Sequence, residues 1–342
     1  MNLLAFLKNW TLPVAILVGT ASYLSFAFVP ALDEAGDRLL PVFETLLPLT
    51  LFCTLFVTFS KVDFHLMRFR RWHFYILAAQ LFIIGVLVIL HFSFFTPHSS
   101  FFFSHSSFFI FHSSLTDKLL LEAVLICVIA PCASASPVVT AKLGGDLTQM
   151  TTFVLLSSVS MALLIPIVFP MVEPPSASDV SSSIIQCSLA IFQRLAAVLL
   201  LPLLLGAVVR HWVQPLYRWF VRTPDLCFYC WCVSLAITAG ITVRNIVHSH
   251  AASHLLGDIA LITMATAVVQ LLIGRLVGRA TGEHICTGQG MFQKNTGLAI
   301  WIAYTYLTPE ASIGAGCYVL WQNIINSYEL WRHRKRSGLS GS

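Results

Sequence analysis

Charged residues are scarce in this chain. Asp, Glu, Lys and Arg make up 10% of its 342 residues, while 57% are hydrophobic; an average soluble domain is about 25% charged. This composition excludes an ordinary soluble enzyme and a disordered protein. The basic residues stand in short clusters between apolar runs and form no single patch, which also excludes a nucleic-acid binder. The chain is therefore predicted to be a polytopic integral membrane protein whose surroundings are the lipid bilayer.

Long polar loops and spaced cysteine pairs are also missing. The connections between apolar runs are short, so no separate soluble domain is expected and residues 1–342 form one membrane domain. Most of the nine cysteines lie inside apolar runs. They therefore do not indicate a disulfide framework.

Ten apolar ranges are long enough to cross a bilayer as helices, which predicts an all-α membrane protein. They cover residues 11–30, 39–59, 72–93, 116–140, 148–170, 185–209, 225–247, 255–277, 287–308 and 310–330. If successive connections between these ranges lie on opposite sides of the membrane, fifteen of the 20 Lys and Arg residues fall on one side and four on the other. Because basic residues collect on the cytoplasmic side, both termini are predicted to be cytoplasmic.

Residues 94–114 contain three near-identical heptads, FFTPHSS, FFFSHSS and FFIFHSS. One interpretation is a metal site made by His98, His105 and His112. The other is a tandem duplication in an outward, low-complexity loop. We favour the duplication, because metal sites usually have more closely spaced ligands and Pro97 weakens a continuous helix.

Two of the ten ranges are interrupted by polar and helix-breaking residues. In the fourth, Pro131 and Pro137 enclose small and hydroxylated residues; in the ninth, the run from Gly288 to Gly297 includes Gln293, Lys294 and Asn295. Proline leaves carbonyls without partners, and in lipid such groups must bond elsewhere or line a cavity. Matched breaks half a chain apart predict a secondary transporter with inverted five-helix repeats, at about 1–171 and 180–331, whose broken helices cross at the midplane.

The interrupted segments carry a family resemblance. The stretch from Ala130 to Thr140, APCASASPVVT, with Gly145-Asp146, resembles the fourth-helix motif APGGTASNVVT…KGD of the bile acid:sodium symporter family. QKNTGLA, which begins at Gln293, resembles its ninth-helix motif, and Gln80 resembles its third-helix glutamine. The resemblance implies panel and core domains that move for alternating access, a small organic-anion substrate, two bound sodium ions and a bacterial inner-membrane location.

Matched position by position, this chain lacks most of the family's sodium ligands. Ser136 matches a ligating serine. Other residues stand where the family has an asparagine, a glutamate, a glutamine and two hydroxyl ligands, namely Pro137, Gly290, Lys294, Met150 and Val154. An ammonium group about 4 Å from a sodium ion repels it by about 4 kcal/mol at intermediate dielectric. Sodium binding is therefore predicted to be weak or absent.

Three roles for Lys294 remain open at this point. In the first, Lys294 provides a fixed positive charge and the protein carries anions without sodium. In the second, Lys294 gains and loses a proton and so couples transport to protons. In the third, the chain is a degenerate family member with little transport. No cofactor other than weakly bound sodium, and no obligate protein partner, is indicated. The predicted substrate- and ion-binding residues are Gln80, Ser134, Ser136, Thr140, Gln293, Lys294, Asn295 and Thr296.

Alternatives to this interpretation use other residues. Arsenite permeases of the same superfamily resemble this chain in the cysteine after Ala-Pro, here Cys132, and a thiolate suits a soft metalloid. An ordinary sodium-coupled symporter is the second alternative. A membrane enzyme is not predicted, because nothing in the sequence places the intramembrane charges Glu122, Arg194 and Lys294 together. The C-x-x-C-x-C run from Cys227 to Cys232 either binds metal or simply packs.

Overall fold

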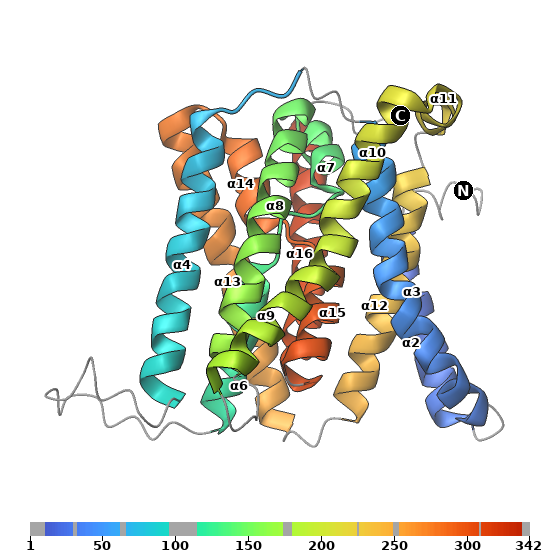
Figure 1. Cartoon of the computed structure of the whole chain (residues 1–342), viewed down its shortest axis with the longest axis vertical. Helices are drawn as coiled ribbons and strands as arrows, with labels where there is room; N and C mark the ends of the chain where they lie inside the picture. The colour runs from blue at the N-terminus through green and yellow to red at the C-terminus, as the bar shows by residue number, and fades with distance from the viewer. Residues whose placement is uncertain are drawn as a thin grey trace, which may run out of the picture.

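The computed structural model describes residues 11–29, 33–61, 66–95, 115–173, 180–223, 226–248, 253–307 and 309–336. Within these ranges the chain is helical and has no strand, which agrees with the predicted all-α class. Most of the helices run roughly side by side (Figure 1). The repeat at 94–114, including His98, His105 and His112, lies almost entirely outside the described residues, and its metal and duplication interpretations are not tested.

Each of the ten predicted ranges overlaps a helix or a broken helix. Eight helical segments form unbroken rods: α2 (Thr11–Phe28), α3 (Asp33–Ser60), α4 (Arg71–Phe95), α8 (Leu147–Val172), α9 (Val180–Leu195) continued by η1 (Ala196–Leu200) and α10 (Leu201–Trp212), α12 (Leu226–Val247), α13 (Ser253–Thr281) and α16 (Pro309–Arg336). Two ranges are divided, into α6 (Leu115–Ile129) with α7 (Ser136–Lys142) and α14 (His284–Phe292) with α15 (Thr296–Tyr306).

Six of the described helices are long and apolar enough to cross a membrane. They are Pro41–Ser60, Arg71–Phe95, Leu147–Val172, Ile184–Trp212, Tyr229–Val247 and His254–Thr281. The breaks leave α6, α7, α14 and α15 too short individually, and the apolar part of α2, Val14–Phe28, is also short. α16 is long enough but is not apolar enough to satisfy this test. These features explain why the helices that satisfy it are fewer than the ten predicted spans. That all ten ranges cross the bilayer stays a prediction.

One helix was missed by the sequence analysis. α11 (Gln214–Arg222) was expected to be part of a connection, because Pro215 and two arginines interrupt the apolar pattern. Proline is well tolerated in the first turn of a helix, so Pro215 begins the helix instead of preventing it. Phe220 is buried, while Arg218, Trp219 and Arg222 are exposed. α11 lies across one end of the bundle (Figure 1), where it contacts α10 and α3.

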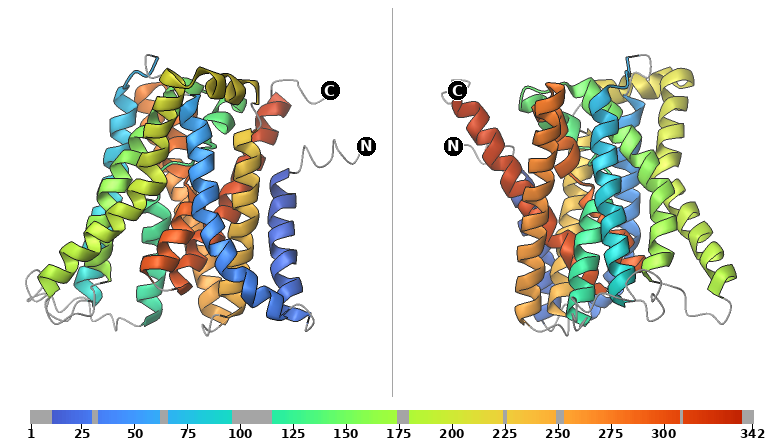
Figure 2. Two further views of the ribbon diagram at one scale, coloured as in Figure 1. Left: turned by 45° about the vertical axis from the view of Figure 1, so that its right-hand side comes forward. Right: turned by 90° about the vertical axis from the view of Figure 1, so that its left-hand side faces the viewer.

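The rod from α9 to α10 contains a local irregularity at Pro202. A proline inside a helix removes one backbone donor and crowds the carbonyl four residues earlier. Here the preceding turn, Ala196–Leu200, widens into a π-helical turn, so the rod continues to Trp212. The whole segment therefore behaves as one long inclined helix (Figure 2).

The helices pack as two groups. α2, α3 and α12 contact one another and α10 contacts α3, while α4, α6, α8, α13, α14 and α16 form the second group, which meets the first where α16 contacts α12. α15 contacts α16 of the second group and also α3 and α12 of the first. The largest buried apolar cluster surrounds the broken helices and includes Ile129, Phe153, Phe292 and Tyr318. The broken segments therefore lie within this buried cluster, next to the boundary between the groups.

α13 and α14 pack through glycine. A Cβ atom added at Gly274 of α13 would lie 2.4 Å from the Thr287 carbonyl oxygen of α14, a distance that real Cβ atoms essentially never show. At Gly257, on the same helix, an added Cβ would meet nothing within 4 Å. Gly274, unlike Gly257, is therefore required for the close approach of the two helices.

We expect Gly274→Ala to destabilise the protein by about 1–3 kcal/mol, because the extra methyl group forces α13 and α14 apart. Gly257→Ala is the matched control and should be neutral or slightly stabilising, since alanine suits a helix better than glycine. Thermal unfolding in detergent measures both. Equal shifts in the two variants would contradict the close packing of α13 and α14.

Candidate functional site

The two helix breaks meet and bond to each other. After α6 ends at Ile129 and α14 ends at Phe292, the extended segments pair antiparallel at Cys132 and Lys294. The Ala133 N–H donates to the Gln293 carbonyl at 2.9 Å, and the Asn295 N–H donates to the Pro131 carbonyl at 2.8 Å. Each unwound segment thus satisfies backbone groups of the other, as a water-free interior requires.

Side chains from neighbouring helices satisfy further backbone groups at the crossing. Gln80 of α4 donates through Nε2 to the carbonyls of Val128, at 2.7 Å, and Ala130, at 3.2 Å. Ser157 of α8 accepts the Cys132 N–H at 2.9 Å, and Gln322 of α16 accepts the Lys294 N–H at 2.7 Å. The crossing is therefore held from three surrounding helices.

Tyr318 of α16 supports the end of α14. Its hydroxyl group donates to the Phe292 carbonyl at 2.7 Å and accepts from Nε2 of Gln270 on α13 at 3.0 Å. Ser157, Gln322 and Tyr318 were not among the predicted site residues. Polar side chains in otherwise apolar helices were the available signal, but their partners depend on three-dimensional packing.

Lys294 is enclosed in the protein. Its side chain is 1% exposed, and among the described residues its Nζ atom has no hydrogen-bond partner. The thiols of Cys127 and Cys132 are its electrostatic neighbours, and no carboxylate of the described chain pairs with it. Lys294 therefore does not extend to a membrane surface. A buried cation without a counter-charge is costly, and such groups mark functional sites.

A small cavity of about 20 Å³, the crossover cavity, lies beside the crossing. Four predicted site residues line it: Ser134, Lys294, Asn295 and Thr296. Hydroxyl groups of α3 and α12 complete the lining, namely Thr54, Ser234 and Thr238, which the sequence analysis missed. Asn295 also caps α15, because its Oδ1 accepts the Leu298 N–H at 3.2 Å. The cavity combines hydrogen-bonding groups, the Lys294 side chain and the positive end of a helix dipole.

The other four predicted residues lie near the crossing but do not line this cavity. Gln80 contacts the end of α6, as described above. Ser136 begins α7 and accepts a hydrogen bond from the Cys132 thiol at 3.3 Å. Thr140 and Gln293 are buried, and their side-chain polar atoms have no partner among the described residues. The structure therefore divides the predicted set into a cavity group and a supporting group.

Aromatic rings occupy the space around Gly290. A Cβ atom added there would lie 3.1 Å from the Phe153 ring and 3.5 Å from the Trp72 ring. The two ring centroids are 5.4 Å apart. Met150 and Val154, on the same helix as Phe153, are fully buried. This side of the crossing is thus an apolar, densely packed region without room for a longer polar side chain at Gly290.

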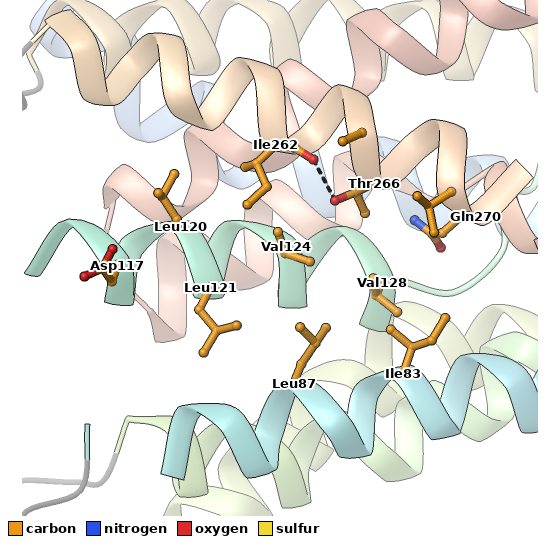
Figure 3. A pocket seen from close by; sticks show the side chains of 12 residues that line it. Ile83, Leu87, Asp117, Leu120, Leu121, Val124, Val128, Ile262, Thr266 and Gln270 are labelled. Atoms are coloured by element: carbon orange, nitrogen blue, oxygen red, sulfur yellow. Dashed lines mark hydrogen bonds between the residues drawn. The ribbon is translucent and has the colours of Figure 1, made fainter. Parts of the chain in front are cut away.

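Two cavities of several hundred Å³ have none of the eight predicted site residues in their linings. An apolar groove of about 470 Å³ runs between α4, α6 and α13 (Figure 3). Its polar lining residues are Asp117, Thr266 and Gln270, and the Thr266 hydroxyl bonds to its own helix at the Ile262 carbonyl. The groove suits hydrocarbon better than an anion. The second cavity, of about 480 Å³, lies between α2, α3 and α12 and includes Arg244.

Other candidate groups from the sequence are dispersed. Glu122 of α6 is fully buried and lies 3.6 Å from the Lys118 ammonium and 3.8 Å from the His91 ring, and it does not line the cavity beside the crossing. The Arg194 guanidinium lies over the Tyr306 ring at 6.0 Å. Among the residues that the structure places, no group of three or more His, Cys, Asp or Glu is arranged to hold a metal, Cys227, Cys230 and Cys232 included.

Comparison with known proteins identifies the family. The model of the sodium bile acid symporter family matches residues 48–277, which include the first helix break and end before α14. No curated protein matches the chain. Members of this family are sodium-coupled transporters of the bile-acid type, not enzymes. The match covers more than half of the sequence, and the chain belongs to the sodium bile acid symporter family of integral membrane transport proteins.

Proposed function

We propose that this protein is a secondary transporter of a small organic anion in which Lys294 replaces bound sodium as the positive charge. The observation that carries the proposal is a fully buried lysine, without a counter-charge in the described structure, lining a polar cavity at the helix crossing. Bile-acid-like molecules, steroid conjugates and small carboxylates carry the anionic group that such a site favours. A cation held in a low-dielectric interior attracts an anion strongly.

Alternating access is supported by the position of the cavity. It lies where α15 meets α3 and α12, at the boundary between the two helix groups. Its volume of about 20 Å³ holds no more than about one water molecule, so the site is closed in this conformation. We infer that the group of α2, α3, α10 and α12 acts as the panel domain and that its displacement opens the site to substrate.

The inverted repeat is supported by the order of the elements. In each half, an interrupted pair, α6 with α7 or α14 with α15, comes fourth when the short helix α11 is left out, and it is followed by one long helix. α4 contacts α6 and α8, as α13 contacts α14 and α16. We propose two five-helix repeats within one transporter domain, inserted in a bacterial inner membrane with both termini in the cytoplasm.

Loss of sodium binding is supported by the surroundings of Gly290. The family's glutamate would place a carboxylate beside the crossing, but the Phe153 and Trp72 rings fill that space here. Pro137, Met150 and Val154 provide no side-chain oxygen at the other corresponding positions. Without these oxygen ligands, a sodium ion would keep too little of its coordination shell to repay dehydration.

The arsenite alternative receives less support. Cys132 is buried, its thiol donates to Ser136, and it does not line the crossover cavity. An ordinary sodium symporter stays an alternative, and thermal unfolding in the presence of sodium distinguishes it from the proposed carrier.

Sodium chloride should leave the thermal unfolding temperature unchanged relative to choline chloride at equal ionic strength. A ligand that binds only the folded state stabilises it as its concentration passes the dissociation constant. The measurement uses the purified full chain and a sodium titration. A saturable stabilisation by sodium, absent with choline, would show that Lys294 does not replace the ion.

Lys294→Gln should lower substrate accumulation in proteoliposomes roughly 10- to 100-fold, because it removes a charge-assisted interaction. Its thermal stability should stay equal or rise, since the variant no longer buries an unpaired cation. Uptake of a radiolabelled bile acid, a steroid sulfate and a small carboxylate is compared with Lys142→Gln, which removes an exposed lysine. Unchanged uptake of every transported probe in Lys294→Gln would refute the proposed role.

A further inference from the structure

A basic cavity opens at the end of the bundle where α11 also lies. It has a volume of about 210 Å³ and is formed between α13, α14 and α16. Three arginines and two histidines line it, against one carboxylate: Arg275, Arg332, Arg336, His284, His333 and Glu329. It lies outside the crossover cavity, and the proposed transport mechanism does not use it.

The one carboxylate among the described residues that line this cavity is already engaged. Glu329 forms an ion pair with Arg275 through one oxygen, and its other oxygen accepts from Gln289 Nε2 at 3.0 Å. Arg332 lies close enough to repel Arg275, and in the described part of the chain neither Arg332 nor Arg336 has an ion-pair partner. The cavity therefore carries uncompensated positive charge, which an anion would neutralise.

The buried side of the cavity offers two further interactions. Gln289 is 1% exposed, and its Oε1 has no hydrogen-bond donor among the described residues. α14 begins at this cavity with His284, and the side chain of Glu283 does not cap it, so N–H groups of the first turn remain available. This arrangement suits a phosphate ester that also carries a hydroxyl group, because the hydroxyl can donate to Gln289.

Exposed aromatic residues place the cavity at the membrane surface. Tyr328 and Trp331, beside Arg332 on α16, are 55% and 51% exposed, and Trp212 and Trp219 at the same end are 72% and 50% exposed. Tryptophan and tyrosine collect at the level of the lipid headgroups. The basic cavity is therefore positioned to meet a headgroup more readily than a solute in bulk water.

We propose that this cavity binds the headgroup of an anionic phospholipid with a free hydroxyl group, of which phosphatidylglycerol is the simplest example. Arg332 and Arg336 contact the phosphate group, and Gln289 accepts the headgroup hydroxyl. Because the cavity is formed by α13, α14 and α16, the bound lipid links these three helices at the end of the bundle.

The test titrates phosphatidylglycerol into the purified full chain in detergent and follows thermal unfolding, with native mass spectrometry as a second measurement. The variant Arg332→Gln/Arg336→Gln should raise the apparent dissociation constant roughly tenfold or more. The matched control, Arg218→Gln/Arg222→Gln, removes two exposed arginines of α11 at the same end and should bind as the wild type does. All four substituted arginines are exposed, so neither double variant is expected to prevent folding.

Several outcomes would overturn the proposal. Equal weakening in both double variants would indicate attraction to a diffuse basic surface. Equal stabilisation by phosphatidylcholine would exclude recognition of headgroup charge, and equal stabilisation by inorganic phosphate would indicate a soluble-anion site. For a protein too unstable to melt cooperatively, retention of phosphatidylglycerol but not phosphatidylcholine in the mass spectrum of the wild type supports the proposal, and equal retention refutes it.

Discussion

The fold depends on how a water-free interior satisfies backbone groups where a helix is broken. Pro131 has no N–H, and the segments after Ile129 and Phe292 leave helical geometry at a depth where solvent cannot replace the lost bonds. Each break supplies the partner that the other needs, through Ala133 with Gln293 and Asn295 with Pro131. Two breaks together are therefore stable where a single one would leave unpaired donors and acceptors. The surrounding helices are arranged so that Gln80, Ser157 and Gln322 reach the groups that remain.

Much of this arrangement follows from the sequence, because apolar length and helix-breaking residues are local signals. The ten apolar ranges, and the breaks near Pro131 and Lys294, are visible as patterns. The hydrogen-bond partners at the crossing are not visible in the sequence, because they depend on which residues of distant helices face the crossing. Gln322 and Ser157 have no distinguishing pattern around them. α11 was missed for a related reason: its apolar side is short, and packing of Phe220 against α3 and α10 determines that it folds as a helix.

The site shows the same division between local and spatial information. Gly290 and Lys294 are recognisable as departures from a family pattern, and the charge they remove or add is known from residue type alone. The side chains that fill the space beside Gly290 cannot be recognised from the sequence. The Phe153 and Trp72 rings reach Gly290 from two other helices, and Thr54, Ser234 and Thr238 join the cavity from the opposite group. The charged residue at this site could therefore be predicted from the sequence, whereas the shape of the cavity and its closure follow only from the packing of the helices.

The reliance of the crossing on main-chain bonds has an evolutionary consequence. The two bonds between the broken segments use only main-chain carbonyl groups, which every residue provides, and N–H groups, which every residue except proline provides. Side chains at Lys294 and Ser136 can consequently be exchanged without dismantling the scaffold that presents them. A lineage can thus replace the ion that drives transport by changing a few side chains while the crossed helices persist. Divergence in energy coupling is then expected to proceed faster than divergence in architecture.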